Sequence, residues 1–457
     1  MSEPFGLGVR SAPHSLYVTY SSFGARSTPT HRIQFLRFFF IFTSRPASLI
    51  TILKFSRAQF LVLIRYSVLR ISNSHKVYSV LLQMRLPRVF RRIDWALVAS
   101  AFLLALLGVV LLSTAGEETG ARSLALRQGV FALVGMGLMF LFGRLHYSVF
   151  RSLAVPLYVL VLLLVVFTLV QEHRIRGVAA WIVIGGMQFQ PAELLKVALV
   201  LMLARVSAVS SSPLSFRRLL TIAALVGVPL VLVLRQPDFG MASLVFFIAV
   251  GMTLVMGLSR RQLLALGVLA VIAAIAGWQV FLADYQKERI LVFLNPQRDP
   301  LGSGYTAIQA RTAFGSGGMF GRGLGWGPQS RLNFLPEAHN DFVFARIGEE
   351  LGLIGVGIVL LLFAVLFHRM VRAAQRTSDA FGRAVAVGSL LAILVGLGVN
   401  AGMNIGLLPV TGVPLPFISY GGSNLLASSL LLGLVLSVVA HGEKWERAAE
   451  ESVLIEA

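Results

Sequence analysis

The sequence predicts an all-α polytopic membrane protein, and three observations carry that prediction. Hydrophobic residues make up 56% of the 457 residues, only 13% are charged, and the mean hydropathy is +0.79. A soluble globule of this length exposes more charge than that. Several apolar runs approach the roughly 20 residues that a helix needs to cross a bilayer core. Basic residues also concentrate in every second connection between those runs.

Ten apolar segments of helical length follow residue 94. They lie at 95–114, 126–142, 154–170, 193–209, 218–234, 239–258, 262–283, 342–367, 384–404 and 422–440. The connection between the seventh and eighth segments is far longer than an ordinary loop. We therefore expect about ten transmembrane helices with one large loop between helices 7 and 8.

The placement of lysine and arginine predicts the orientation of these helices. Arginines precede the first segment and recur in alternate connections, and Lys444 and Arg447 follow the last segment. Nearly all acids outside the C-terminal tail fall in the other connections. Both termini are therefore expected in the cytoplasm, and the large loop outside it. This bias accounts for the net charge of +20 better than nucleic-acid binding does.

Residues 1–83 differ from the rest of the chain. They hold ten Lys or Arg residues and a single acid, Glu3. Arginines and lysines interrupt each apolar stretch before it reaches spanning length, and a charge at mid-bilayer is costly. We interpret 1–83 as a basic extension, either disordered or upstream of a true start at Met84, and 84–457 as the membrane domain. A basic amphipathic arm on anionic lipid is the alternative.

Four connections on the predicted outer side carry polar residues in unusual settings. Pro191 can occupy a first helical turn, which places Glu193 and Lys196 on one helical face; a simple local ion pair is the structural alternative. Asp238 follows a proline and can cap the next helix, and Asp299 in "NPQRDPLG" can cap a turn.

The other two connections depart from regular helix. The glycine-rich "GSGGMFGRGLGWG" lies in the large loop without a preceding strand, so it is a weak phosphate-binding signal. Three prolines and paired glycines in 407–424 interrupt any helix there, and irregular backbone near a membrane must be buried in protein or line a cavity. Arg346, Glu349 and Glu350 lie within the eighth segment, where ions are functional candidates or a mutually satisfied group.

In this order the segments resemble the SEDS family of peptidoglycan polymerases, the shape, elongation, division and sporulation proteins. The matching stretches are "FQPAELLK", "QPDFG", "NPQRDPLGSGYTAIQARTAFGSGG", "GRGLGWGPQSRLNFLPEAHNDFVFARIGEELGLIG" and "LPVTGVPLPFISYGGS". They span essentially all of 84–457. The "RIDW" start and the lack of a long division-type tail favour the elongation member of the family over the division member.

The resemblance implies a ten-helix glycosyltransferase of the cytoplasmic (inner) membrane that polymerises lipid II at the outer face. It also implies a class B penicillin-binding protein as transpeptidase partner, together with elongation-complex membrane proteins. The family's essential aspartate falls on Asp299 as the catalytic residue. The residues implied to bind substrate, by family position or by lying in the matched motifs, are Glu193, Lys196, Asp238, Arg298, Arg311, Arg322, His339, Asp341, Glu349, Ser419 and Tyr420.

The chemistry suits these residue types. A carboxylate can remove the proton of an acceptor hydroxyl as it attacks the donor sugar. The leaving group is a lipid pyrophosphate, which needs positive charge more than a proton. The family commonly has an arginine before the tryptophan of the second outer loop, where this chain has Ala180; Arg176 is an alternative source of that charge.

No cofactor is expected. The chain has no cysteine and no Asp-x-Asp pair, so a divalent cation is not indicated, although the sequence does not exclude one. Three alternatives stay open: a division-type polymerase of the same family, a lipid II flippase that uses the intramembrane ions, and a non-catalytic scaffold. Transporters commonly contain two matching halves, and this sequence has no evident repeat.

Overall fold

The computed structural model describes residues 93–114, 121–171, 178–185, 187–208, 214–276, 279, 284–332 and 334–456. The chain divides into two units, Met1–Asn73 and Ser74–Ala457, and every described residue lies in the second. The predicted extension at 1–83 lies outside the described residues, and the division at residue 84 stays a prediction.

Ten helices form the bundle in the described part of the chain. They are α5 (Trp95–Ser113), α6 (Ala121–Arg144), α7 (Tyr147–Val170), α8 (Pro191–Ser207), α9 (Phe216–Arg235), α10 (Phe239–Met256), α11 (Arg260–Ala276), α15 (Val343–Gln375), α16 (Ala380–Asn404) and α17 (Gly422–Glu456). Each coincides with one of the ten predicted segments. Eight are long and apolar enough to cross a membrane, whereas α8 and α11 have 17 residues each. The all-α polytopic fold is confirmed.

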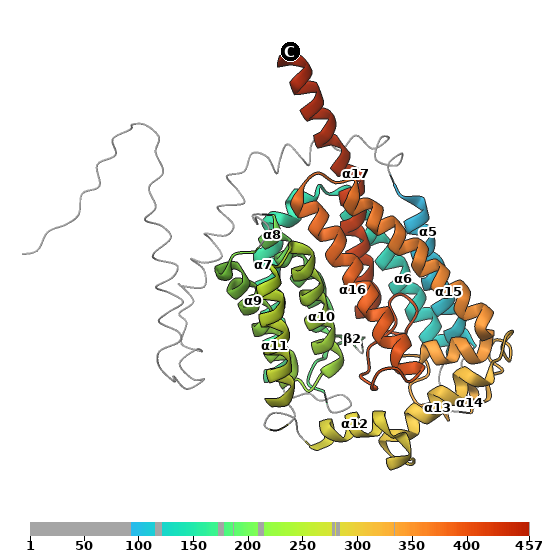
Figure 1. Cartoon of the computed structure of the whole chain (residues 1–457). Coiled ribbons are helices and arrows are strands. Elements are labelled where there is room, and N and C mark those ends of the chain that lie inside the picture. Colours follow the sequence, from blue (N-terminus) through green and yellow to red (C-terminus); the bar gives the residue numbers. More distant parts are fainter. Residues whose placement is uncertain are drawn as a thin grey trace, which may run out of the picture. The chain divides into compact units, whose positions relative to one another are not determined.

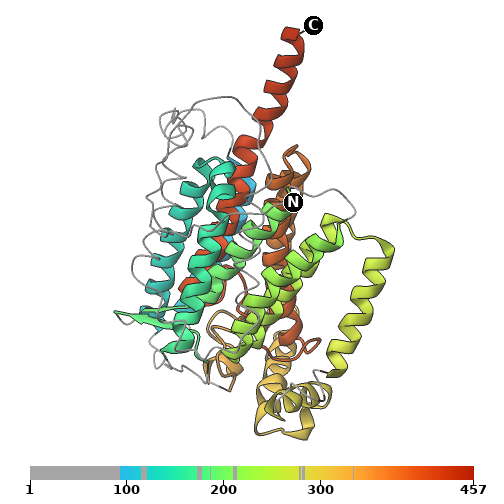
Figure 2. The same cartoon turned by 90° about the vertical axis from the view of Figure 1, so that its left-hand side faces the viewer.

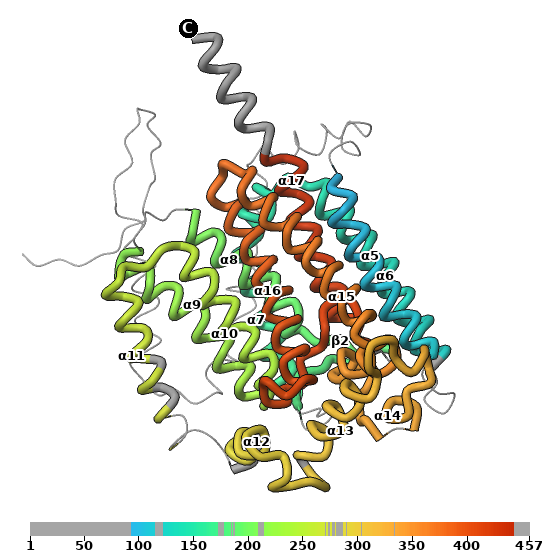
Figure 3. The backbone as a smooth tube through the Cα atoms, turned by 45° about the vertical axis from the view of Figure 1, so that its right-hand side comes forward, coloured from blue at the N-terminus to red at the C-terminus, as the bar shows by residue number. Residues whose placement is uncertain are grey.

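Successive helices run in opposite directions through the bundle (Figures 1 and 3). The shorter elements gather at one end. They are the antiparallel hairpin β1 (Ile182–Ile184) and β2 (Met187–Phe189), and α12 (Asp284–Leu294), η5 (Pro296–Arg298), α13 (Ser303–Ser316) and α14 (Pro328–Arg331). We call this the hairpin end and the other the far end. Figure 2 shows α11 at the edge of the bundle.

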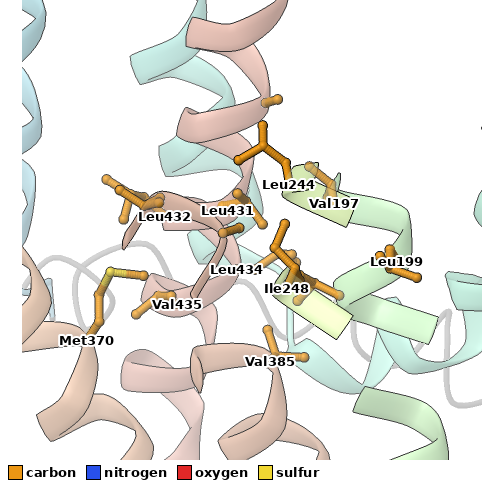
Figure 4. Packing of buried hydrophobic residues seen from close by; sticks show 14 of the residues in the cluster. Val197, Leu199, Leu244, Ile248, Met370, Val385, Leu431, Leu432, Leu434 and Val435 are labelled. Carbon is orange, nitrogen blue, oxygen red and sulfur yellow. The ribbon is translucent and has the colours of Figure 1, made fainter. Parts of the chain in front are cut away.

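The core lies where α8, α10, α15, α16 and α17 meet (Figure 4). Leu199 on α8, Ile248 on α10 and Leu434 on α17 are fully buried there. These helices are apolar around most of their circumference, as expected for helices that pack inside a bundle and also face lipid. Helices α8 and α17 thus form a rigid support for the residues at their hairpin-end termini.

An aspartate is the N-cap residue of three of the helices. Asp94 accepts a hydrogen bond from the Leu97 N–H of α5, Asp238 from the Met241 N–H of α10, and Asp379 from the Gly382 N–H of α16. Such caps satisfy N–H groups that have no partner within the helix. The predicted capping position of Asp238 is confirmed.

Helix α15 is not continuous, unlike the predicted helix at 342–367. Gly352 has φ 66° and ψ −167°, which breaks the helix in its hairpin-end part. The glycine-rich loop supplies the missing hydrogen bonds: the Leu353 N–H donates to Gly318 O at 3.0 Å, and the Arg322 N–H donates to Glu349 O at 2.9 Å. This loop therefore serves as backbone support for a broken helix.

Close backbone contact explains why glycine is needed in that loop. A Cβ added to Gly321, whose φ is 80°, would lie 2.3 Å from Glu350 O, and one added to Gly317 would lie 1.9 Å from Gly348 O. Neither approach is possible for a residue with a side chain. The break in α15 and the glycine-rich loop consequently depend on each other.

Gly321→Ala is expected to destabilise the detergent-purified protein by about 2 kcal/mol or more, because the new methyl group meets a backbone carbonyl in a strained conformation. Gly315→Ala is the matched control: it lies in α13 with open space around a Cβ. That change should be neutral or stabilising by roughly 0.5–1 kcal/mol. Equal melting temperatures for the two variants would contradict this account of the loop.

Candidate functional site

A cavity of about 660 Å³ opens at the hairpin end of the bundle. Its walls come from α6, the hairpin, the start of α8, the 237–239 turn, α12, α13, the 339–341 turn, the end of α16 and the irregular segment 408–424. Of the predicted site residues, six line it: Glu193, Asp238, Arg311, His339, Asp341 and Tyr420. Residues far apart in sequence thus converge on one cavity.

Glu193 and Lys196 form a buried ion pair at the base of the cavity. Lys196 Nζ lies 2.6 Å from Glu193 Oε2, and only 6% and 2% of the two side chains are exposed. Lys196 also donates to Asn424 Oδ1 at 3.4 Å. The predicted placement of both residues on one face of the helix is confirmed, and Pro191 begins that helix as expected. Glu193 lines the cavity, and Lys196 lies behind it.

Asp238 lies beside this pair, outside the membrane-spanning segments. Its Oδ2 accepts a hydrogen bond from Gln190 Nε2 at 3.0 Å, and its Oδ1 accepts one from the Met241 N–H at 2.9 Å. Burial and then the negative charge of Glu193 raise the pKa of Asp238, against the lowering effects of its hydrogen bonds and of Lys196. A carboxyl with a raised pKa in a cleft is a candidate functional group.

Two arginines supply positive charge to the cavity. Arg311 on α13 was predicted; its Nη2 donates to Gly406 O at 3.4 Å, and the side chain is exposed. Arg127 on α6 was not predicted, yet it also lines the cavity and is exposed. The signal was present in the sequence, because an arginine inside an apolar helix commonly faces a protein interior or a wet cavity. Arg176, the suggested alternative cation, lies outside the described residues.

His339 and Tyr420 hold two segments together at the cavity wall. The Tyr420 N–H donates to His339 O at 2.9 Å, and the two rings meet edge to face with centroids 6.1 Å apart. Neighbouring Asn340 donates through its amide to Glu337 Oε2 at 2.7 Å. The Asn340 Oδ1 is buried and has no hydrogen-bond partner among the described residues. Since Asn340 lines the cavity, it offers an acceptor to a ligand there.

Ser419 acts on the protein backbone and does not line the cavity. Its hydroxyl donates to Asn340 O at 2.6 Å and accepts from the Leu415 N–H at 2.8 Å. Its carbonyl accepts from Gln128 Nε2 at 3.1 Å, and Gln128 Oε1 accepts from the Gly421 N–H at 3.3 Å. These bonds shape the irregular segment that carries Tyr420.

Asp299 lies outside the cavity wall, on the turn before α13. Its Oδ1 accepts a hydrogen bond from the Gly302 N–H at 3.0 Å, which is the turn-capping geometry considered from sequence. Arg298 pairs with Glu288 at 3.2 Å on the exposed surface of α12 and η5. The helix that follows, α13, contributes Thr306, Ala307 and Arg311 to the cavity. The catalytic role of Asp299 stays a prediction.

The intramembrane ions of α15 are held within the protein. Arg346 Nε lies 2.7 Å from Glu350 Oε1, and Glu350 Oε2 accepts from the Gly325 N–H at 3.1 Å. Glu349 is fully buried and accepts from the Gln329 N–H at 2.7 Å and the Ser330 N–H at 3.1 Å, at the start of α14. Neither Glu349 nor the exposed Arg322 lines the cavity. The geometry of Glu349 favours the structural alternative, and substrate binding by these two residues stays a prediction.

Within the part of the chain that the structure describes, no group of three His, Asp or Glu side chains is placed to hold a metal ion. The expectation from the sequence, that a divalent cation is not indicated, stays a prediction.

Comparisons with known proteins agree with one another. Residues 91–444 match the FTSW_RODA_SPOVE family, described as a cell cycle protein. The peptidoglycan glycosyltransferase MrdB of Escherichia coli K12 is 38% identical over 343 residues, which cover 74% of this chain and 92% of that protein. The probable peptidoglycan glycosyltransferase FtsW of Geobacter sulfurreducens is 37% identical over 359 residues, with coverages of 76% and 95%.

Solved structures with the same fold and more than 30% identity to this chain include the following two. A chain from work on the structural coordination of polymerization and crosslinking by a peptidoglycan synthase complex has 34% identity and a TM-score of 0.67, covering 76% of this chain and 97% of that one. The rod shape determining protein RodA of Thermus thermophilus has 31% identity and a TM-score of 0.57, with coverages of 77% and 97%.

Lys196→Met is expected to destabilise the protein by about 3–5 kcal/mol, because it leaves the buried Glu193 carboxylate without its cation. The double variant Glu193→Gln/Lys196→Met should recover most of that loss. Thermal melting in detergent measures both. A double variant less stable than Lys196→Met alone would show that the pair is not the source of the effect.

Proposed function

Because the chain belongs to the FTSW_RODA_SPOVE family of cell cycle proteins, we propose that it is a peptidoglycan glycosyltransferase that polymerises lipid II. We propose the hairpin-end cavity as its substrate site. The observation that carries the proposal is the pairing of cations with acids in one cavity where the membrane-spanning helices end. Lipid II has a sugar head, an anionic pyrophosphate and a polyprenyl tail. A charged cavity beside helices with many exposed apolar residues suits all three parts.

Arg127 and Arg311 are proposed to bind the pyrophosphate. Both line the cavity, and they come from different helices, α6 and α13. Positive charge aimed at a departing pyrophosphate stabilises the charge that develops as the sugar–phosphate bond breaks. Glu193 is neutralised by Lys196, so the pair leaves the anion little to repel it. The two arginines thus offer positive charge to an anionic leaving group, and Lys196 neutralises one of the three acids that line the cavity.

Asp299 is proposed as the general base. The acceptor hydroxyl oxygen forms a bond to the anomeric carbon of the donor, its proton passes to the Asp299 carboxylate, and the bond between that carbon and the phosphate oxygen breaks. The lipid pyrophosphate leaves with the bonding electrons. Asp299 lies on the turn that leads into α13, and α13 lines the cavity. An acceptor sugar lying across the start of α13 would therefore lie between Asp299 and a donor held in the cavity.

The same family contains elongation-type and division-type enzymes, and the relatives found include both. We propose the elongation role, supported by the similarity to MrdB and to RodA. Depletion of the protein distinguishes the two roles, since rounded cells indicate elongation and filaments indicate division. A transpeptidase partner is proposed on the similarity to a chain of a peptidoglycan synthase complex that coordinates polymerization and crosslinking.

A flippase is less well supported than it was on sequence alone. That alternative relied on Arg346, Glu349 and Glu350 as ions inside the membrane. In the structure these side chains satisfy one another and the 325–330 backbone. They are therefore committed to the fold, and do not argue for a transport path.

Asp299→Asn is expected to lower the rate of lipid II polymerisation by roughly 10²–10⁴-fold, because the amide cannot accept the proton. The measurement is glycan formation from labelled lipid II by purified protein with its transpeptidase partner. Glu288→Gln, which removes an exposed acid of α12, is the control and should change the rate by less than about threefold. If Asp299→Asn kept full activity while Asp238→Asn lost it, the role of base would pass to Asp238.

Arg127→Gln and Arg311→Gln should each lower the polymerisation rate by about tenfold or more, because each removes a charge from the pyrophosphate site. Arg235→Gln removes an exposed arginine at the same end of the bundle outside the cavity and serves as the control. Losses of equal size in all three variants would mean that net charge, not the cavity, is responsible.

Orientation can be tested with engineered thiols, since the chain contains no cysteine. We propose that the hairpin end faces outward and the far end faces the cytoplasm, as the lysine and arginine pattern favours. Gln297→Cys and Ser378→Cys place thiols at exposed positions of the hairpin end and the far end. In intact spheroplasts an impermeant maleimide should label only the cysteine at 297. Labelling only at 378 would reverse the orientation.

A further inference from the structure

A second cavity, of about 240 Å³, lies at the far end of the bundle, opposite the proposed active site. It is formed by the start of α5, the last turns of α15 and the 438–442 part of α17. This volume is below the roughly 300–1,000 Å³ of typical sites for drug-sized ligands. An ion or a lipid headgroup is therefore a better match to it than a large soluble molecule.

Three arginines at the end of α15 line this cavity: Arg369 and Arg372 within the helix, and Arg376 as its C-cap residue. They follow one another at intervals of three and four residues, so they share one face of the helix. Among the described lining residues, Asp94 is the one acid against these three arginines. The cavity therefore has the charge of an anion site.

The acid is already committed to other partners. One oxygen of Asp94 accepts from the Leu97 N–H at 3.2 Å, and the other lies 2.6 Å from Arg369 Nε. The Asp94 side chain is only 5% exposed. Arg369 is thereby fixed in position, whereas the side chains of Arg372 and Arg376 are exposed and have no hydrogen-bond or ion-pair partner among the described residues. Two guanidinium groups are left to bind an external anion.

The apolar part of the wall indicates the kind of anion. Ile93, Val438 and Val439 lie beside the arginines. The cavity is also level with the ends of membrane-spanning helices, since α5 begins at Trp95 and α15 ends at Gln375. Headgroups of the adjacent leaflet lie at that depth. A phosphodiester joined to acyl chains meets both requirements, whereas free phosphate uses only the charge.

We propose that this cavity binds the phosphodiester headgroup of an anionic phospholipid from the leaflet at the far end, with Arg372 and Arg376 as its ligands and Arg369 as a fixed neighbour. Guanidinium groups recognise phosphate oxygens through paired, charge-assisted hydrogen bonds. The site is independent of the proposed glycosyl transfer, because it lies at the other end of the bundle.

Binding of dioleoylphosphatidylglycerol to the full-length protein tests the proposal, with dioleoylphosphatidylcholine as the neutral lipid and native mass spectrometry as the readout. Wild-type protein should retain the anionic lipid in preference to the neutral one. Arg372→Gln/Arg376→Gln should weaken its retention by about tenfold or more, since each arginine near a membrane surface contributes about a factor of five. Both side chains are exposed, and the melting temperature shows whether the variant is folded.

Arg260→Gln/Arg261→Gln is the matched control, because it removes two exposed arginines at the same end of the bundle but outside the cavity. It should leave retention unchanged within about twofold, and Arg372→Lys/Arg376→Lys should retain an intermediate amount. Equal losses in both glutamine variants, or no loss in either, would overturn the proposal. Release of the lipid by an equal concentration of inorganic phosphate would assign the site to a soluble anion and overturn the lipid as its ligand.

Discussion

The structure depends on the hydrogen-bond partners of the irregular backbone between α16 and α17, at the end of the membrane bundle. A backbone N–H or C=O without a partner costs several kcal/mol away from water. Asn400 and Asn404, one turn apart on α16 and fully buried, provide these partners. Asn400 donates to Val413 O at 2.7 Å and to Asp341 O at 2.9 Å, and Asn404 donates to Asp341 O and accepts from the Ala345 N–H, both at 2.9 Å. Two amides thus join α15, α16 and the irregular segment.

The hydrogen bonds that Asn400, Asn404 and Gln128 make to the backbone, which we call the frame, position the cavity wall and the side chains on it. The frame holds Asp341 and Tyr420 on one wall, and the segment continues into α17, where Asn424 accepts from Lys196 and Ser423 accepts from the Gln190 N–H. Gln190 then donates to Asp238. The acids and the lysine of α8 and α10 are therefore connected through hydrogen bonds to the irregular backbone. A preorganised polar site of this kind can stabilise developing charge without rearranging during the reaction.

The fold could be predicted from the sequence because its signals are local and strong. The lengths of the apolar runs predicted the ten helices, and Asp238 and Pro191 indicated where α10 and α8 begin. The residues of the frame could not be identified in that way. Asn400, Asn404 and Gln128 are single polar residues in apolar helices, and their partners lie in segments that only tertiary packing brings near. The break at Gly352 escaped prediction for the same reason, since the carbonyls that compensate it come from a distant loop. Arg127 was missed because the predicted segment began at residue 126 and so put this arginine at the end of the helix, whereas α6 begins at Ala121 and places Arg127 within it.

The central claim is that the hairpin-end cavity holds lipid II. The most direct measurement is photo-crosslinking with a lipid II analogue that carries a diazirine on its sugar, followed by mass mapping of the modified peptides. The account predicts modification of peptides from α6, α13 and residues 408–424, which line the cavity, with loss of the crosslinks when unlabelled lipid II is in excess. Crosslinks confined to the far end of the bundle, or spread evenly over the lipid-facing helices, would contradict it.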